Sequence, residues 1–253
     1  MSLWHDTAGV GPDLVLLHGW GMNAAVWQPL LPGLQERFRV TRIELPGHGE
    51  SPLLEGGLDG WTRACQAVAP ARAAWVGWSL GGLLALRAAL LAPQRVERLC
   101  LVTATPSFVQ HEDWPQAMPA PVFEQFAQVL LDDPATTLKR FLGLQVKGAE
   151  DARTTLRTLN EALAQRPDPQ PRGLQLGLQL LHEGDLRGSL GQLQVASHWL
   201  FGARDTLVPA GVAGAIQARL PQARAQLVDG AGHAPFLSHP QQCLHWLEES
   251  CGS

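Results

Sequence analysis

The sequence predicts an α/β fold in which a mostly parallel central sheet is flanked by helices, with a helical cap inserted before the last strands. Three observations predict it. Short apolar runs alternate with longer helical stretches over the first half of the chain, as in a sheet whose parallel strands are joined by helices. A long segment without any strand-like run then follows. Apolar runs resume only near the end of the chain.

Six segments are predicted to be strands because each is a short apolar run bounded by turn-forming or polar residues. Two of them end in glycine-containing loops, at His18-Gly19 and at Pro46-Gly47-His48-Gly49. Such loops indicate that the chain turns sharply as it leaves the sheet. The predicted strands are Leu14 to Leu17, Phe38 to Leu45, Ala73 to Gly77, Leu99 to Thr103, Ser197 to Phe201 and Ala225 to Val228.

The segment from about Phe108 to Gly184 has a different pattern. Apolar residues recur there at three- and four-residue spacing over 121–131, 134–146 and 149–165, and two of these stretches open with proline near the first helical turn. We therefore expect a helical cap, or lid, over residues 108–185. The core domain is then expected to consist of residues 1–107 and 186–253.

Composition limits the class of protein. The chain has 253 residues, of which 45% are hydrophobic and 17% charged, which predicts a globular protein with a sizeable core. Its net charge of −4 argues against a general nucleic-acid binder. No signal peptide is visible at the N-terminus, and no apolar run approaches the roughly 20 residues of a membrane helix. We expect a cytoplasmic monomer with no membrane partner.

Neither a metal nor a cofactor is expected. The four cysteines form no CxxC pair and no Cys/His metal spacing, so free, mostly buried thiols in a reducing compartment are predicted. Gly9-Val10-Gly11 and Gly47-His48-Gly49 do not extend to the G-x-G-x-x-G pattern that opens a helix in dinucleotide-binding folds.

The strongest chemical signal is Gly77-Trp78-Ser79-Leu80-Gly81, a G-x-S-x-G motif between an apolar run and a helix of small residues. A serine at a sharp strand-to-helix turn holds a strained backbone, and close packing on both sides tolerates only glycine. The turn lifts the hydroxyl clear of the sheet, and the helix points N–H groups at developing negative charge. Ser79 is therefore the predicted nucleophile.

A serine hydroxyl needs a base to take its proton, and that base needs an acid to orient it. His233 lies in a glycine-rich loop directly after the last predicted strand, at the sheet edge where ligands bind in open α/β folds. Asp205 follows the preceding strand, so the chain order is serine, aspartate, histidine, as this class of fold requires. The predicted triad is Ser79, Asp205 and His233.

Several other residues fit these two roles less well. His18 and His48 belong to loops at the same sheet edge and stay open as alternative bases. Asp185 precedes its strand, and Asp229 is too close along the chain to His233 to support the ring. The remaining histidines near helices or strands are expected to be structural or solvated, namely His198, His239 and His245.

A tetrahedral intermediate also needs two backbone donors for its oxyanion. The residue after the nucleophile normally supplies one of them, which here is the N–H of Leu80. The loop His18-Gly19-Trp20-Gly21 follows the first predicted strand. We expect the N–H of Trp20 to be the second donor.

Four segments together resemble a particular family. They are LVLLHGWGMNAAVW, WVGWSLGGL, RFLGLQ and GAGHAPFLSHP. The first carries an HG and the second a G-x-S-x-G that many α/β-hydrolases share, whereas GWSLGG, RFLGLQ and HAPFLSHP in one chain are more specific. The chain resembles the pimeloyl-acyl carrier protein methyl ester esterases of biotin synthesis over nearly its whole length, cap included. The resemblance implies the α/β-hydrolase fold.

The resemblance also implies an activity and its residues. The family enzyme hydrolyses the methyl ester of a pimeloyl chain on acyl carrier protein, which frees a carboxylate and ends chain elongation. Ser79, Asp205 and His233 match the family's triad. Four further positions match substrate-binding residues of the family: Trp20 and Leu80 at the oxyanion, and Phe141 and Gln145 in the cap, along the acyl channel.

Charge in the cap favours an acyl carrier protein as partner. Residues 134–166 contain six basic and three acidic residues, a balance of +3 in a chain of −4. Arg153 and Arg157 are four apart and share a helix face, and an acidic carrier is steered by such a patch. By the resemblance, Arg140, Arg153 and Arg157 fall at carrier-contacting positions. Thr136 occupies a position that is basic in the family. A carrier affinity weaker than the family's is therefore expected, unless Lys139 compensates for the missing charge.

Several different functions would share the same motifs. A broad short-chain esterase that takes small-molecule esters, a lactonase or a C–C hydrolase would use the same triad, and only the cap and the pocket would differ. A non-catalytic ligand-binding protein on this scaffold is disfavoured by the complete triad. Dehalogenase chemistry is disfavoured because the motif carries serine in place of aspartate.

Overall fold

In the computed structural model, which describes residues 2–147 and 149–252, seven strands form one sheet in the order β1-β3-β2-β4-β5-β6-β7. β1 runs antiparallel to β3, and the other neighbouring strands are parallel. The mostly parallel sheet predicted from the sequence is confirmed. The strands are β1 His5–Ala8, β2 Asp13–Leu17, β3 Arg39–Ile43, β4 Ala73–Trp78, β5 Val96–Val102, β6 Ser197–Gly202 and β7 Arg224–Val228.

The first strand, β1, is the one that the sequence did not predict. Its four residues, HDTA, are polar or small, and three of them are exposed, so no apolar run marks it. Tertiary pairing with β3 defines it instead: Thr7 Oγ1 lies 2.9 Å from Thr41 Oγ1, and Asp6 forms an ion pair with Arg42. Cross-strand pairs of this kind stabilise a short edge strand that local propensity does not specify.

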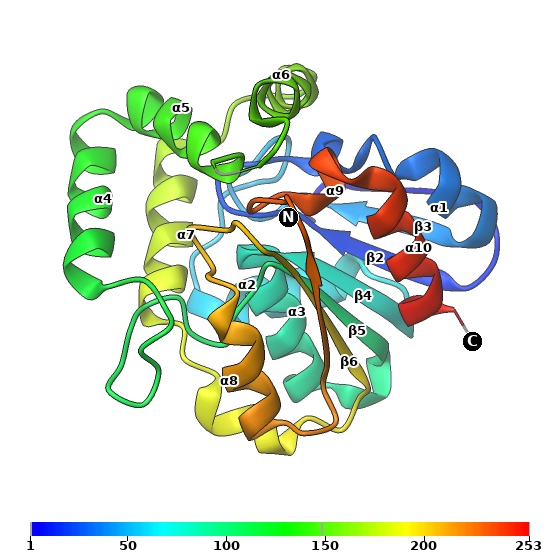
Figure 1. The fold of residues 1–253 in the computed structure, drawn as a ribbon. Coiled ribbons are helices and arrows are strands. Elements are labelled where there is room, and N and C mark those ends of the chain that lie inside the picture. Colours follow the sequence, from blue (N-terminus) through cyan, green and yellow to red (C-terminus); the bar gives the residue numbers. More distant parts are fainter. Residues whose placement is uncertain (1, 148, 253) are drawn as a thin grey trace.

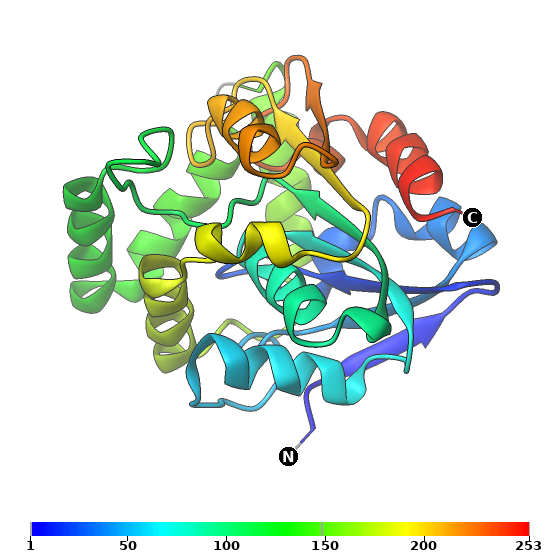
Figure 2. The same ribbon diagram turned by 90° about the horizontal axis from the view of Figure 1, so that it is seen from below.

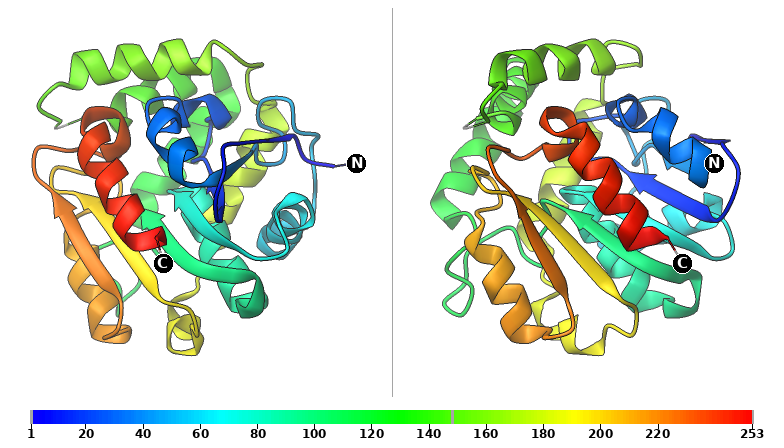
Figure 3. Two further views of the ribbon diagram at one scale, coloured as in Figure 1. Left: turned by 90° about the vertical axis from the view of Figure 1, so that its right-hand side faces the viewer. Right: turned by 45° about the vertical axis from the view of Figure 1, so that its right-hand side comes forward.

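Helices cover both faces of the sheet. α1 (Leu31–Arg37) and α10 (Pro240–Cys251) pack together on one face, beside the short α9 (Pro235–Ser238), as Figure 3 shows. α2 (Gly57–Val68) and α3 (Leu80–Leu91) pack together on the other face (Figure 2). Apart from Arg87, α3 consists of apolar residues and glycine, because it lies between the sheet and other helices. α8 (Gly211–Arg219) packs against β7. Three short 3-10 helices lie in the connections outside the long cap segment: η1 (Ala24–Trp27), η2 (Pro93–Arg95) and η3 (Arg187–Gln192).

Among the described residues, four α-helices, here called the cap helices, lie between β5 and β6 in the chain, and Figure 1 shows them gathered beside the sheet with α4 farthest from it. Three of them begin with proline in the first turn, where the missing N–H costs nothing. The side chain of Asp133 caps α5 by accepting the Thr136 N–H at 3.1 Å. The cap helices are α4 Ala120–Asp132, α5 Pro134–Gln145, α6 Ala152–Leu163 and α7 Pro171–Glu183.

Arg166, between α6 and α7, ties the cap helices to the core. Its Nε lies 3.3 Å from Glu44 Oε1, its Nη1 lies 2.9 Å from Glu50 Oε1, and its guanidinium lies 3.5 Å above the ring of Trp4. The Glu44 side chain is fully buried. Burial raises the pKa of Glu44, opposed by backbone hydrogen bonds and by the charge of Arg166. We call this group the Arg166 clamp.

All four cysteines are free and buried. Burial raises the pKa of both Cys65 and Cys243 to about 12, so these thiols stay protonated at neutral pH. Within residues 2–147 and 149–252, none of the helices is both long and apolar enough to cross a membrane.

Candidate active site

The candidate site lies at the point in the sheet where the order of successive strands reverses. β2 sits between β3 and β4, so the chain builds the sheet first to one side of β2 and then to the other. Open α/β sheets bind ligands at the carboxyl ends of the strands at such a point. The loop after β2 carries Gly19 and Trp20, and Ser79 directly follows β4. These two loops touch, since a Cβ on Gly19 would lie 3.3 Å from the Cβ of Ser79.

Ser79 occupies a strained turn. Its φ of 54° and ψ of −117° lie outside the regions that residues with a side chain prefer. The flanking glycines are required by contact: a Cβ on Gly77 would lie 2.3 Å from the carbonyl oxygen of Gly81, and one on Gly81 would lie 2.4 Å from that of Leu17. The Ser79 N–H donates to Val102 O at 3.1 Å, which anchors the turn to β5.

His233 and Asp205 form a buried pair. His233 Nδ1 lies 2.7 Å from Asp205 Oδ2, and both side chains are almost fully buried. Because a carboxylate can only accept, Nδ1 carries the proton and Nε2 is left as the basic nitrogen. The other carboxylate oxygen, Oδ1, accepts the N–H groups of Leu207 at 2.8 Å and Val208 at 3.0 Å. The aspartate is therefore fixed on its own loop and holds one tautomer of the ring.

Three elements hold the main chain of His233. Its N–H donates to Gln145 O at 2.9 Å, at the end of α5. Its carbonyl oxygen accepts the Trp78 Nε1–H at 2.8 Å and the Thr103 hydroxyl at 2.7 Å. Trp78 belongs to the G-x-S-x-G motif itself, and Thr103 follows β5. The loop of the candidate base is thus connected to both the turn that carries Ser79 and the cap helices.

Ser79 and His233 both lie on the wall of one apolar cavity. The rest of the wall comes from the loop after β2, from the segment after β5 and the cap helices, and from the loop after β6. A polar reacting pair in an otherwise apolar cavity suits a ligand with one reactive polar group and an aliphatic body. The other lining residues are Trp20, Phe108, Met118, Val122, Phe123, Phe126, Phe141, Leu144, Leu178, Leu181 and Leu207.

An aromatic cluster fixes one side of this cavity. The Trp20 ring meets Phe141 edge-on at 4.8 Å between centroids and Phe126 at 5.7 Å. Its Nε1–H donates to Leu174 O at 2.8 Å, so the indole is held at both ends. The cluster joins the loop after β2 to α4, α5 and α7, and both Trp20 and Phe141 line the cavity.

Gln145 departs from its predicted place. The resemblance placed it along the acyl channel, but it is not among the residues that line the cavity. Its side chain is buried and donates to Phe141 O at 3.3 Å, one helical turn earlier, and its carbonyl holds His233. Its observed contacts are therefore with the helix and with the candidate base. Leu80 is fully buried at the first position of α3, directly after Ser79.

His18 and His48, which the sequence left open as bases, are engaged elsewhere. Both rings donate from Nδ1 to a backbone carbonyl and accept a backbone N–H at Nε2: His18 from Leu45 at 3.0 Å and His48 from Gly21 at 3.1 Å. Burial, together with the neighbouring His48, lowers the pKa of His18 to about 3, and burial lowers that of His48 to about 4. Both rings are neutral cross-links that hold the loop after β2 against the loop after β3.

Asp185, His239 and His245 are not among the residues that line the cavity. Asp185 pairs with Arg187 at 2.7 Å, which lowers the pKa of the carboxyl. His239 hydrogen-bonds to Ser238, and His245 forms an exposed pair with a glutamate on its own helix. In the described part of the chain, no three His, Cys, Asp or Glu side chains gather as a metal site would need.

Most of the cavity wall was not singled out from the sequence. Phe108, Phe123, Phe126 and Leu178 belong to apolar patterns on helices and loops, and the same pattern describes an ordinary core. Helical periodicity shows that a face is buried but not whether it faces packed side chains or a cavity. The aromatic residues of the cap segment are the signal that could have pointed to a cavity there.

Comparison with known proteins agrees with the fold. Residues 12–240 match the family model described as alpha/beta hydrolase fold. The structure of an esterase from Exiguobacterium antarcticum superposes with a TM-score of 0.89 over 99% of this chain and 96% of that chain, at 21% identity. At that identity the likeness shows the fold alone. The chain belongs to the α/β-hydrolase family.

Relatives in sequence identify one family within the α/β-hydrolases. The chain is 47% identical to the pimeloyl-[acyl-carrier protein] methyl ester esterase of Xanthomonas campestris pv. campestris, over 96% of both chains. It is 42% identical to the protein of that name from Aeromonas hydrophila subsp. hydrophila, over the full length of both. Within the α/β-hydrolases, the chain belongs to the family of pimeloyl-[acyl-carrier protein] methyl ester esterases. The resemblance drawn from four sequence segments is confirmed.

Proposed function

We propose that this chain is a serine carboxylesterase that hydrolyses the methyl ester of pimeloyl-acyl carrier protein, releasing methanol, as a step of biotin synthesis. One observation supports the proposal above all: Ser79 and His233 line the same apolar cavity, and His233 is hydrogen-bonded to Asp205. The identity of 42–47% to esterases of that name supports the same substrate. The proposal includes that the enzyme is a monomer and acts in the cytoplasm.

In the proposed reaction, Ser79 Oγ attacks the ester carbonyl while His233 Nε2 takes the hydroxyl proton. The tetrahedral intermediate collapses, the bond to the methoxy oxygen breaks, and His233 gives its proton to that oxygen, which leaves as methanol. Water then attacks the acyl-enzyme as Nε2 takes one of its protons. The serine oxygen leaves and regains that proton, and the acid is released. Asp205 stabilises the imidazolium in both halves.

Two backbone N–H groups are proposed to bind the oxyanion. The Leu80 N–H is one of the first donors of α3, which have no partner within the helix and lie at the positive end of its dipole. The Trp20 N–H lies in the loop after β2. That loop is held by His48, whose Nε2 accepts the N–H of the next residue, Gly21. Donors fixed before the reaction stabilise developing charge without reorganisation.

The apolar cavity accounts for the choice of a neutral ester. Each buried methylene contributes roughly 0.8 kcal/mol, so an aliphatic acyl chain binds well against the aromatic wall. A carboxylate in the same place would lose hydration that two N–H donors replace only in part, at a cost of several kcal/mol. The cavity therefore favours the ester over the acid, and the product carboxylate is driven out toward water.

Carrier docking is proposed on the outer surface of α5 and α6. Arg140 on α5 and Arg153 and Arg157 on α6 are exposed, and Arg157 lies 3.9 Å from Glu161 in an exposed pair that contributes little. An acidic carrier would be attracted to this patch at low salt. Arg166, counted among the basic residues of this segment, is engaged in the Arg166 clamp and adds little to the patch.

The chemistry is tested with pimeloyl-acyl carrier protein methyl ester as substrate. Intact-mass measurement of the carrier follows its loss of one methylene unit of mass, and wild type is expected to convert it completely. Ser79→Ala should bind the carrier ester but release no methanol. Conversion by Ser79→Ala at the wild-type rate would rule out the nucleophile assignment. Wild type that ignores the carrier ester yet cleaves short free esters would leave a broad esterase as the function.

The docking surface is tested by charge reversal with a matched control. The double variant Arg153→Glu, Arg157→Glu should raise KM for the carrier ester at least about tenfold, from two reversed charges in the patch, and leave hydrolysis of small free esters unchanged. Arg63→Glu reverses a comparably exposed cation on α2, outside the proposed docking surface on α5 and α6, and should leave both unchanged. An unaltered KM in the double variant would show that the carrier does not dock on Arg153 and Arg157.

A further inference from the structure

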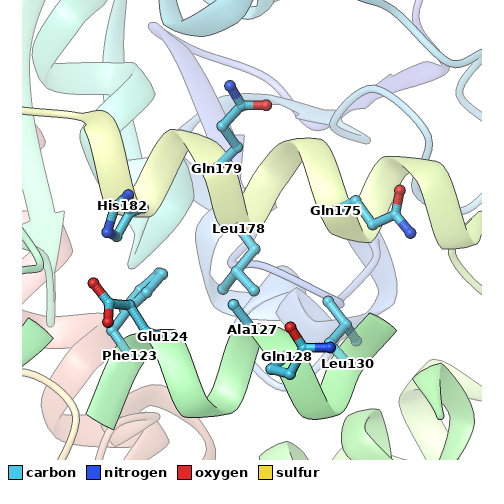
Figure 4. Close-up of a pocket in the computed structure, with 9 residues that line it drawn as sticks. All are labelled: Phe123, Glu124, Ala127, Gln128, Leu130, Gln175, Leu178, Gln179 and His182. Carbon is cyan, nitrogen blue, oxygen red and sulfur yellow. The ribbon is translucent and has the colours of Figure 1, made fainter. Parts of the chain in front are cut away.

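A second cavity lies beside the one that holds Ser79 and His233. It is a groove between α4 and α7, shown in Figure 4. Two residues, Phe123 and Leu178, line both the groove and the Ser79 cavity, so the two spaces share a wall. We call these two residues the partition. The other groove residues are Glu124, Ala127, Gln128, Leu130, Gln175, Gln179 and His182.

The partition is made of side chains rather than backbone. Leu178 points from α7 toward Ala127 on α4, and Phe123 lies beside His182 at one end of the groove (Figure 4). The Phe123 ring rests on the His182 ring with 5.4 Å between centroids and is 5% exposed. His182 itself is exposed, so the groove side of Phe123 is held mainly by a surface side chain.

The groove is suited to an aliphatic chain. Ala127 and Leu130 add to the apolar surface that the partition presents, while glutamines and a glutamate lie at the rim. A chain that passed the partition would find apolar surface on both helices. A chain that left the Ser79 cavity through its mouth would instead enter water, where further methylenes gain no burial.

We infer that Phe123 is a specificity-determining residue: its ring ends the part of the cavity that can bury an acyl chain, and the α4–α7 groove behind it would bury a longer one. The inference rests on the proposed function, since it takes Ser79 as the nucleophile that fixes one end of the chain. The kcat/KM of the wild type should rise with acyl length only until the chain fills the Ser79 cavity. In a variant without the Phe123 ring, kcat/KM should continue to rise for longer chains.

The test uses p-nitrophenyl esters with acyl chains of four, eight and twelve carbons. Phe123→Ala joins the two spaces. It should raise the ratio of kcat/KM for the twelve-carbon to the four-carbon ester about tenfold over wild type, the gain from burying about two more methylenes. Adding Ala127→Phe fills the groove and should return the ratio to the wild-type value. Ala127→Phe alone, behind an intact partition, should leave the ratio unchanged.

Fold and nucleophile are monitored in every variant by thermal unfolding and by fluorophosphonate labelling of Ser79. Phe123→Leu keeps an apolar side chain on α4 and should give a smaller gain in the same direction if Phe123→Ala does not fold. A wild type that cleaves the esters, with a ratio that neither variant changes, would overturn the inference and leave the proposed function intact. A wild type that cleaves none of them but releases methanol from the carrier ester would overturn the inference alone, and one that hydrolyses neither kind of ester would overturn both.

Discussion

Removal of Arg166 tests how the cap helices are held to the core. Arg166→Met keeps an apolar side chain near Trp4 but leaves the fully buried Glu44 carboxylate without its cation. Removing one partner of a buried ion pair leaves an uncompensated charge, which destabilises the fold more than replacing both partners with apolar residues. We expect a loss of stability that depends on the charge of Glu44 and not merely on lost packing.

The size of the loss follows from the contacts. Breaking a buried pair from one side typically costs about 3–5 kcal/mol. Glu44 keeps two backbone donors, Ala24 N–H at 3.2 Å and Glu50 N–H at 2.7 Å, and the Arg166 side chain is 16% exposed. We therefore expect about 2–3 kcal/mol at neutral pH, at or just below the lower end of that range. In a Glu44→Gln background the same change should cost about 1 kcal/mol or less.

The pH dependence has a definite sign. Burial already raises the pKa of Glu44 above its ordinary value, so its ionised form opposes folding, and stability is lost as pH rises through the folded pKa. Without Arg166 this pKa rises further. The loss in Arg166→Met should therefore be largest at neutral pH and smaller at pH 5, where Glu44 is more readily protonated.

Urea unfolding of wild type, both single variants and the double variant, at pH 8 and at pH 5, measures these quantities. We predict a coupling free energy between Arg166 and Glu44 of at least about 1 kcal/mol at pH 8, since the residues are in direct contact. Additive effects of the two changes, or an equal loss at both pH values, would show that the charge of Glu44 does not set the cost.

Three further outcomes are expected. His18 and His48 stay neutral in the fold, with pKa values near 3 and 4, while the unfolded chain protonates them near pH 6.5. Stability should therefore fall as pH drops from 6.5 toward 4, by about 2 kcal/mol per histidine at pH 5, and urea titration of wild type against His48→Gln checks this. Gly81→Ala, whose Cβ would lie 2.4 Å from Leu17 O, should abolish turnover and lower the melting temperature; normal activity would show that the turn adapts. Asp205→Asn should lower kcat by about 10³–10⁴ with the fold retained, as single-turnover kinetics would show; a loss below about tenfold would remove the orienting role.

The parts of the fold and site that follow strand ends could be predicted from the sequence. Buried parallel strands are apolar runs that stop at glycine or proline, so the loops carrying Ser79, Asp205 and His233 could be assigned to one sheet edge without a structure. The structure places Asp205 against His233, and both Ser79 and His233 on one cavity. β1 could not be predicted because its pairing with β3 is tertiary and its residues are polar or small.

Features that depend on contacts between distant segments could not be predicted. Gln145 holds His233 through its carbonyl oxygen, which any residue type would provide, so its identity carries no signal of that role. Arg166 counts as a surface charge in the sequence, yet it faces a buried carboxylate more than a hundred residues earlier. Phe123 follows the periodicity of a core helix, and only the folded structure shows that it lines two neighbouring cavities.

The proposed carrier-bound substrate is tested most directly by comparing two forms of one ester with the wild-type enzyme: pimeloyl methyl ester on acyl carrier protein and the same ester on free pantetheine. Both present the same ester to Ser79, and only the first can contact Arg140, Arg153 and Arg157. We predict a higher kcat/KM for the carrier form, with an advantage that shrinks as salt screens the patch. Equal efficiency on both forms at low salt, or no release of methanol from either, would contradict the proposed function.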